Sequence, residues 1–236
     1  TIQNPTGYGR IIRASSGQVT GIVEEKDATP EQRLVKEVNT GVMAIKGSYL
    51  KRWLTNLSSN NAQGEYYLTD VVERAVEEGV EIATQAAQSE HEVMGINNRA
   101  QQAFVERAYQ QEIAEGLLAS GVTIADPKRI DVRGNLTVGK DTFIDVNNVY
   151  SGNVSIGNNV VIEPNCVITN ATIGDNVYIK SNTVLEDCVL ASNNEVGPFA
   201  RLRPGTELAD GAKIGNFVET KKAKIGNGSK VNHLSY

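Results

Sequence analysis

The sequence is poor in cysteine, histidine and long apolar runs, and these shortages exclude several classes of protein. The two cysteines, Cys166 and Cys188, are spaced for neither a disulfide framework nor a metal knuckle, so we expect reduced thiols in a cytoplasmic protein. No apolar run approaches the roughly 18 residues that span a bilayer, and no signal peptide is recognisable, so no membrane partner is expected. The net charge of −5 argues against binding to nucleic acid or to anionic lipid.

The two ends of the sequence indicate a piece of a longer protein. The chain begins at Thr1 without an initiator methionine and ends at Tyr236 in the middle of a repeat, so we expect an internal fragment. The composition changes near residue 121, where mixed sequence with helix-forming runs gives way to Val, Ile, Asn, Gly, Thr and Asp. We predict three segments from this change: 1–98, a linker helix over 99–121, and 122–236.

Strands and helices alternate in the first segment. The predicted elements are strands at 9–14, 19–24, 38–45 and 91–94, and helices at 48–57 and 70–78. A longer helix is expected over 99–120, with Asn98 as its N-cap and Gly121 just past its end. The alternation predicts an α/β domain that is cut short at its N-terminus.

An apolar residue recurs at nearly every sixth position from Val138 to the end of the chain. With one-residue slips, the row consists of Val138, Ile144, Tyr150, Ile156, Ile162, Ile168, Ile173, Ile179, Leu185, Leu190, Val196, Leu202, Leu208, Ile214, Ile225 and Val231. This period matches neither an α-helix nor a regular strand, whose side chains repeat at about 3.6 and 2 residues. It is typical of a solenoid of short parallel strands, with Asn and Gly at corners that need positive φ. A β-sandwich is the alternative, but sandwich strands alternate in twos.

The sign of the charge reverses within this repeat. Residues 126–195 contain five basic and nine acidic side chains, whereas residues 201–230 contain seven basic and three acidic ones. Such a reversal inside one regular solenoid predicts an anionic ligand at the later coils. A solvated basic face is the alternative explanation of the same counts.

Eight strings in order relate the chain to a known family. They are PTGYGR at 5–10, GIVE at 21–24, NTG at 39–41, NAQGEYY at 61–67, GINNR at 95–99, GPFARLRPG at 197–205, GNFVETKK at 215–222 and HLSY at 233–236. Through them the whole chain resembles the bacterial bifunctional N-acetylglucosamine-1-phosphate uridyltransferase/glucosamine-1-phosphate N-acetyltransferase family. The resemblance implies a Rossmann-like nucleotidyltransferase domain, here truncated, followed by a left-handed parallel β-helix of hexapeptide repeats.

The resemblance implies an acetyltransferase site on the last coils. Arg203 and Lys221 would bind the phosphate and sugar of glucosamine 1-phosphate, and Tyr236 would hydrogen-bond the same substrate. His233 would be the general base that takes a proton while the 2-amino group attacks the thioester of acetyl-CoA. Glu219 would orient His233 or the amine. Outside this motif, a single histidine such as His233 is more often structural.

A second activity is implied for the first segment, the joining of UTP to N-acetylglucosamine 1-phosphate with the help of Mg²⁺. Gly9, Glu24 and Asn39 would contact the N-acetylglucosamine moiety, and Tyr67 would line the sugar pocket. Asn97 would ligate Mg²⁺ through its carbonyl oxygen. Local sequence alone favours turn residues at Gly9 and Asn39, and a helix-capping neighbour at Asn97.

The resemblance also implies that parts of both sites lie outside this sequence. The glycine-rich phosphate loop and the aspartate that partners Asn97 would precede Thr1, and most of the acetyl-CoA site would follow Tyr236, partly on a neighbouring subunit. We therefore expect this chain by itself to be inactive in both steps. The family further implies a cytoplasmic homotrimer that makes UDP-N-acetylglucosamine for peptidoglycan, cell-wall and lipopolysaccharide synthesis.

Three alternatives remain. The first is a single-function sugar-1-phosphate nucleotidyltransferase whose β-helix serves only for trimerisation; Arg203, Lys221, His233 and Tyr236 argue against it as a set. The second is a zinc carbonic anhydrase of hexapeptide fold, which needs three histidine ligands, whereas the sequence has two histidines. The third is a trimerisation module without catalytic activity.

Overall fold

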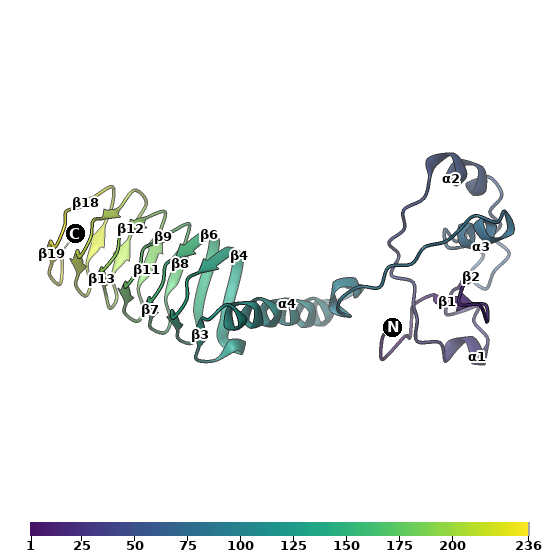
Figure 1. Cartoon of the computed structure of the whole chain (residues 1–236), viewed down its shortest axis with the longest axis horizontal. Coiled ribbons are helices and arrows are strands. Elements are labelled where there is room, and N and C mark those ends of the chain that lie inside the picture. The colour runs from purple at the N-terminus through teal and green to yellow at the C-terminus, as the bar shows by residue number, and fades with distance from the viewer. Residues whose placement is uncertain (236) are drawn as a thin grey trace. The chain divides into compact units, whose positions relative to one another are not determined.

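The computed structural model, which describes residues 1–235, divides into two compact units (Figure 1). One comprises Thr1–Arg99, and the other begins at Ala100. The long helix that was expected as a separate linker therefore groups with the second unit, apart from its first residue. The functional division at residues 98 and 121 stays a prediction.

The first unit combines a two-stranded sheet with short helices. Its antiparallel strands are β1 (Arg10–Arg13) and β2 (Val19–Val23), and its helices are α1 (Pro30–Arg33), α2 (Gly47–Leu54), α3 (Asp70–Glu77) and the 3₁₀ helix η1 (His91–Val93). The mixture confirms the predicted α/β character. The first two predicted strands and the helices predicted at 48–57 and 70–78 lie within a few residues of their observed bounds.

A small apolar core joins α2 to α3. Trp53 of α2 is buried against Val71 and Ala75 of α3. Tyr49 stacks on Trp53 with ring centroids 5.1 Å apart. Helix α3 also contacts β2, so this core holds the start of α3, at Thr69, close to the residues that follow β2.

The strand predicted over residues 38–45 is wrong apart from a single bridge between Val38 and Arg10. The side-chain oxygen of Asn39 accepts a hydrogen bond from the Gly41 N–H at 3.2 Å. Gly41 has a φ of +82°, a left-handed conformation that does not fit a ladder. Local side-chain-to-backbone bonding therefore replaces pairing between strands in this segment.

The strand predicted over residues 91–94 is also wrong, because η1 occupies this position. The Glu92 carboxylate accepts a hydrogen bond from the Gln88 N–H at 3.0 Å, which closes a local turn. The two strands of this unit pair only with each other in the sheet. A segment without a neighbouring strand has no ladder to join, whatever its β propensity.

The second unit is a parallel β-helix. After α4 (Arg99–Ala119), its elements are β3 (Thr123–Ile124), η2 (Pro127–Arg129), β4 (Ile130–Val138), β5 (Phe143–Ile144), β6 (Asn148–Ile156), β7 (Val161–Ile162), β8 (Val167–Thr169), β9 (Thr172–Ile173), β10 (Tyr178–Ile179), β11 (Val184–Glu186), β12 (Val189–Leu190), β13 (Glu195–Val196), β14 (Arg201–Leu202), β15 (Glu207–Leu208), β16 (Lys213–Ile214), β17 (Glu219–Thr220), β18 (Lys224–Ile225) and β19 (Lys230–Val231). Ile144 pairs with Ile162, and Ile162 with Ile179, so successive coils repeat after 18 and 17 residues. Each coil therefore holds three repeats of about six residues. This confirms the predicted β-helix of hexapeptide repeats and is consistent with the left-handed coil that the resemblance implied.

The six-residue row forms the core of this unit. Ile144, Ile162 and Ile179 are fully buried, and the equivalent positions of later coils extend the same stack. Burying each such side chain contributes roughly 1.5–3 kcal/mol. The β-helix therefore has a continuous apolar core, in contrast to the small cluster of the first unit.

Asparagine occupies many of the corners, as predicted. Asn147, Asn165 and Asn182 have φ values of 63°, 64° and 60°. The Asn147 side-chain amide donates to the Asn165 side-chain oxygen at 3.0 Å, so the same corner is bonded from coil to coil. Asparagine suits these positions because its short polar side chain tolerates the left-handed conformation.

Helix α4 packs against the N-terminal end of the β-helix. Ala114 is fully buried there, with Ile113 and Leu117 packed beside it. The Gln110 amide donates to the Val132 carbonyl and accepts from the Val132 N–H, both at 2.8 Å. The amide thus pairs with the open edge of β4, which would otherwise present unsatisfied backbone groups. Phe104, nearer the start of α4, is 61% exposed.

Both cysteines are free and buried in the β-helix. Burial raises the pKa of Cys166 to about 11 and that of Cys188 to about 12, so both thiols stay protonated at neutral pH. Among residues 1–235, no helix is both long enough and apolar enough to cross a membrane.

Candidate functional site

The later coils bring Arg203 and Glu219 together. Arg203 follows β14 and Glu219 begins β17, which lies on the next coil with Arg201 opposite Glu219. The Arg203 Nη1 donates to the Glu219 Oε1 at 2.9 Å. Both side chains are half-buried. One guanidinium N–H is thus engaged inside the protein, and the remaining donors of this planar group are available for an anion.

Lys221 has no acidic partner among the described residues, whereas Arg203 and two other basic residues of the later coils do. Lys213 pairs with Glu195 and Lys224 with Glu207, each at 3.0 Å. The exposed Lys221 side chain has no ion-pair or hydrogen-bond partner within residues 1–235. The excess positive charge of the later coils is therefore partly neutralised within the fold, and Lys221 keeps an unpaired ammonium one coil beyond Arg203.

His233 lies on the last coil, directly beyond Gly215. A Cβ built on Gly215 would approach the His233 backbone nitrogen to 3.0 Å, so a larger residue at Gly215 would displace this coil. The Glu219 N–H donates to the Ser235 carbonyl at 2.9 Å, which joins the coil of His233 to that of Glu219. The His233 side chain is exposed. Its coil therefore sits beside the Arg203–Glu219 pair.

The structure gives Glu219 a partner that the sequence did not predict. Its carboxylate binds Arg203, and no bond from it to His233 occurs among the described residues. Orientation of His233 or of the amine by Glu219 stays a prediction. The fifth residue expected in this site, Tyr236, lies outside the described residues.

In the first unit, three of the expected sugar-contact residues gather around the end of β2. The Asn39 N–H donates to the Gly9 carbonyl at 2.8 Å. A Cβ on Gly9 would lie 3.2 and 3.3 Å from the Glu24 carboxylate oxygens and 3.0 Å from Ile22. Glycine at this position therefore lets the backbone lie close to the Glu24 carboxylate.

Thr69 joins this cluster, although the sequence did not identify it. Its buried hydroxyl donates to the Glu24 Oε1 at 2.9 Å. Thr69 precedes α3, where sequence rules assign a threonine to helix capping, but its side chain makes no capping bond there. No local signal distinguishes the two roles, because Glu24 is 45 residues away in the chain.

Tyr67 lies at the edge of the same cluster. Its hydroxyl accepts a hydrogen bond from the Gln63 amide at 2.9 Å. Partial burial raises the pKa of Tyr67, and the nearby carboxylates of Asp27 and Glu24 raise it further. Tyr67 is therefore a neutral hydrogen-bonding group at neutral pH, close to the residues expected to contact the sugar.

Asn97 is exposed, and its segment is attached near Gly9 by the Gly95 N–H, which donates to the Tyr8 hydroxyl at 3.1 Å. Within residues 1–235, no group of three or more His, Cys, Asp and Glu side chains lies close enough to hold a metal ion. The described residues thus do not form a metal site of three such ligands around Asn97. The Mg²⁺ role of Asn97 stays a prediction.

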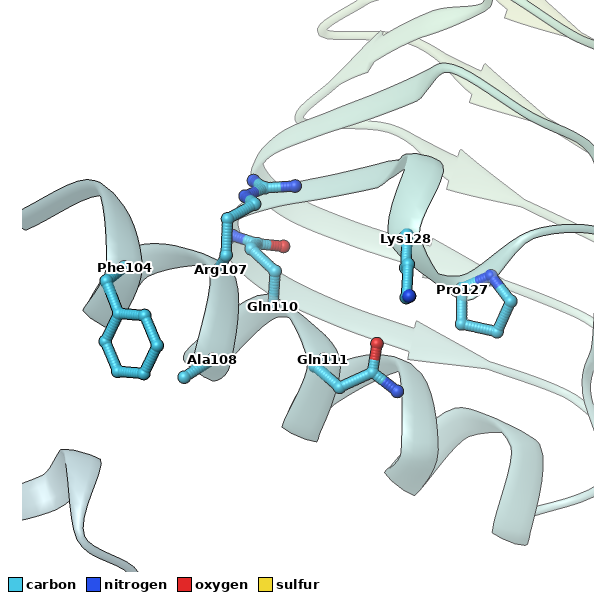
Figure 2. Close-up of a pocket in the computed structure, with 7 residues that line it drawn as sticks. All are labelled: Phe104, Arg107, Ala108, Gln110, Gln111, Pro127 and Lys128. Carbon is cyan, nitrogen blue, oxygen red and sulfur yellow. The ribbon is translucent and has the colours of Figure 1, made fainter. Parts of the chain in front are cut away.

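A separate apolar groove of about 360 Å³ lies between α4 and η2 (Figure 2). The residues that line it are Phe104, Arg107, Ala108, Gln110, Gln111, Pro127 and Lys128. None of these residues belongs to the expected catalytic or binding sets. This groove is therefore distinct from both candidate sites.

Comparisons with known proteins match the chain along its whole length. It is 58% identical over 235 residues to a protein of Marinobacter nauticus, 57% identical over 235 residues to one of Saccharophagus degradans, and 53% identical over 236 residues to one of Burkholderia multivorans. Each is named bifunctional protein GlmU. The matches cover 100% of this chain and 52% of each relative, so the chain spans about half the length of these relatives.

A family model matches most of the β-helix, and several solved structures match about half of the chain. The model of the GMPPB C-terminal domain matches residues 132–235. A mutant of AntD, an N-acyltransferase of Bacillus cereus in complex with dTDP and coenzyme A, has a TM-score of 0.39 and 14% identity, covering 48% of this chain and 79% of its own. The UDP-N-acetylglucosamine acyltransferase of Campylobacter jejuni has a TM-score of 0.34 and 21% identity, covering 48% and 56%.

Proposed function

From the homology of this chain to the GlmU proteins over its whole length, we propose that it is part of a bifunctional transferase. The full-length protein acetylates glucosamine 1-phosphate with acetyl-CoA and then transfers a uridylyl group from UTP to the N-acetylglucosamine 1-phosphate so formed. The single observation that supports this most strongly is 50–58% identity across both units. The products are UDP-N-acetylglucosamine and pyrophosphate, and the sugar nucleotide serves cell-wall synthesis.

The acetyl transfer uses groups of the later coils. The guanidinium of Arg203 and the ammonium of Lys221 bind the phosphate, Arg203 through the donors that Glu219 leaves available. The amine nitrogen attacks the thioester carbon, His233 accepts the proton that the amine loses, and the C–S bond breaks to release coenzyme A as its thiol. Tyr236 makes a further hydrogen bond to the sugar. The exposed position of His233 allows a substrate to reach it.

The uridylyl transfer uses the cluster around Gly9 and Glu24. The lack of a side chain at Gly9 leaves the Glu24 carboxylate open to the sugar, whose hydroxyl and acetamido groups Glu24 and Asn39 contact. Tyr67 borders the same pocket. This step is mainly positioning and charge neutralisation. Asn97 would be one ligand of Mg²⁺, which would supply positive charge for the phosphates.

The proposal extends to the setting of the enzyme. It is a cytoplasmic homotrimer in which the β-helix of one subunit completes the acetyl-CoA site of its neighbour. The trimer is proposed from the family resemblance alone.

The test compares both half-reactions in the full-length protein. His233→Ala is expected to lower acetyl transfer, measured as thiol release from acetyl-CoA, by about 10²–10⁴-fold because general-base catalysis is lost. Uridylyl transfer, measured as pyrophosphate release, stays unchanged in the same variant. His91→Ala, which changes the other histidine, is the matched control and retains acetyl transfer.

Two results would contradict the proposal. Normal thiol release by His233→Ala would mean that this residue is not the base. Absence of acetyl transfer in the unsubstituted full-length protein, with uridylyl transfer intact, would instead favour a single-function nucleotidyltransferase whose β-helix is structural.

A further inference from the structure

One corner of the β-helix has apolar residues in the last coils, where earlier coils have asparagine. In earlier coils its left-handed position is occupied by Asn147, Asn165 and Asn182, whereas the later ones have Phe199, Phe217 and Leu234. Hydrogen bonds between coils show that the positions are equivalent: the Phe199 N–H donates to the Ser181 carbonyl at 3.1 Å, as the Leu234 N–H does to the Asn216 carbonyl. We call Phe199, Phe217 and Leu234 the apolar ridge.

Neither backbone preference nor core packing explains the apolar ridge. Positive φ is uncommon for residues other than glycine, asparagine and aspartate, and a bulky side chain at such a position is an outlier. The three side chains are 50%, 55% and 72% exposed, so the core gains little from them. The rings of Phe199 and Phe217 stack with centroids 5.2 Å apart. Residues that break a local rule without a gain in packing tend to mark functional sites.

The apolar ridge lies between the groups assigned to the two ends of the amine substrate. Arg203 and Lys221 each follow a ridge phenylalanine by four residues, on the coils of Phe199 and Phe217. His233 directly precedes Leu234 on the last coil. Neighbouring coils are about 4.8 Å apart, as in any sheet. Because Leu234 is equivalent to Phe217, His233 precedes this corner along its coil, whereas Arg203 and Lys221 follow it on theirs, so the ridge lies between the two groups.

We propose that the apolar ridge is the surface on which the pyranose ring of the amino-sugar phosphate rests, with Phe217 as the main contact. This inference depends on the proposed acetyl transfer. The carbon-bound hydrogens of one sugar face pack flat on the exposed aromatic ring, while the cations beside it bind the phosphate. The combination of an apolar surface and neighbouring positive charge matches a ligand that is both ring-shaped and anionic.

The test uses the residue that the fold itself places at this corner in earlier coils. In the full-length protein, Phe217→Asn is expected to raise the KM for glucosamine 1-phosphate in acetyl transfer about tenfold, the upper end for loss of one aromatic contact. Because asparagine suits the left-handed backbone, the melting temperature stays equal or rises. Phe217→Tyr, which keeps the ring, restores the KM to near its original value, and uridylyl transfer is unchanged in both variants.

Three other results would overturn the inference. An unchanged KM in a folded Phe217→Asn protein would show that the ring does not contact the sugar. If the KM of Phe217→Asn recovered at higher protein concentration and sedimentation showed that this variant dissociates, the ridge would instead be a contact surface for a second copy of the chain. If the unsubstituted protein does not acetylate at all, the proposed function and this inference fail together.

Discussion

The two units of this chain satisfy their backbone hydrogen bonds and bury their apolar side chains in different ways. The β-helix repeats one solution after every 17 or 18 residues, so each coil is bonded and packed by its neighbours. The first unit has a small core around Trp53, and many of its loops are held by single side chains, such as Thr69 on Glu24. The β-helix therefore does not depend on any single polar contact, but it cannot accept added side-chain volume between neighbouring coils. The first unit, in contrast, depends on individual polar contacts.

The largest effect is expected from added volume in the β-helix. A Cβ on Gly157 would lie 2.7 Å from the Gly174 carbonyl carbon on the next coil and 2.3 Å from the Asp175 Oδ1. Because backbone atoms of the neighbouring coil cannot move away singly, Gly157→Ala is expected to lower the free energy of unfolding by about 2–3 kcal/mol. Urea unfolding monitored by circular dichroism measures it.

Gly226→Ala is the matched control, because the nearest atom to its added Cβ is the Ser229 hydroxyl at 3.6 Å and its φ is not positive. Its effect is expected within about 0.5 kcal/mol. Equal destabilisation by the two substitutions would contradict the idea that coil-to-coil spacing limits volume in this unit.

A smaller effect, with a different consequence, is expected in the first unit. Thr69→Val keeps the shape of the side chain but removes the hydroxyl that donates to Glu24. The net loss is about 1 kcal/mol of stability, because Glu24 is only half-buried and water replaces the donor. In the full-length protein, the KM for N-acetylglucosamine 1-phosphate rises several-fold as the carboxylate loses its fixed position.

Thr69→Ser, which keeps the hydroxyl, is the control and is expected to restore that KM. If Thr69→Val left the KM of uridylyl transfer unchanged, Glu24 would need no orienting partner, and the contrast drawn between the two units would weaken. Acetyl transfer should be the same in all three proteins.

The smallest effect concerns charge on the outside of the β-helix. The Glu195 carboxylate accepts from Lys180 and, at 3.0 Å, from Lys213, and these bonds hold the pKa of Glu195 below its ordinary 4.5. The contribution of the Glu195 carboxylate to the free energy of unfolding is therefore fully present above pH 4.5 and is lost as the pH falls through the lower folded-state pKa. The three side chains are 30–50% exposed, so solvent screening keeps the contribution below about 1 kcal/mol.

Melting temperatures of the wild type and of Glu195→Gln measure this contribution. The difference between them is expected to be present at pH 7 and to be lost as the pH falls through the lowered pKa of Glu195. A difference that persisted at low pH would mean that Glu195 acts through packing rather than through its charge.

The success of sequence-based prediction differed between the units for a physical reason. Ile162 and its equivalents were identified as core because their spacing alone encodes which side of the coil they face. The strand predicted at 38–45 failed because Asn39 and Gly41 form a local turn, which competes with pairing that a distant partner must supply. The pattern of apolar residues predicts which side chains are buried, but it does not predict whether a distant strand is available for pairing.

The candidate sites divide in the same way. Arg203, Lys221 and His233 were named from motifs, and the β-helix then places their coils in succession. The Arg203–Glu219 bond and the Thr69–Glu24 bond could not be inferred, because each joins residues whose separation in the chain has no fixed relation to their separation in space.

By itself the sequence determined the β-helix, its inward row and the family resemblance, because a six-residue period and ordered motifs are properties of the linear chain. Only the tertiary structure decided which cations are already paired, which hydroxyl binds Glu24, and that phenylalanine and leucine replace asparagine at one corner beside the candidate acetyltransferase residues. These are contacts between coils or between distant segments. They arise only when chain folding brings together groups whose partners the local sequence does not specify.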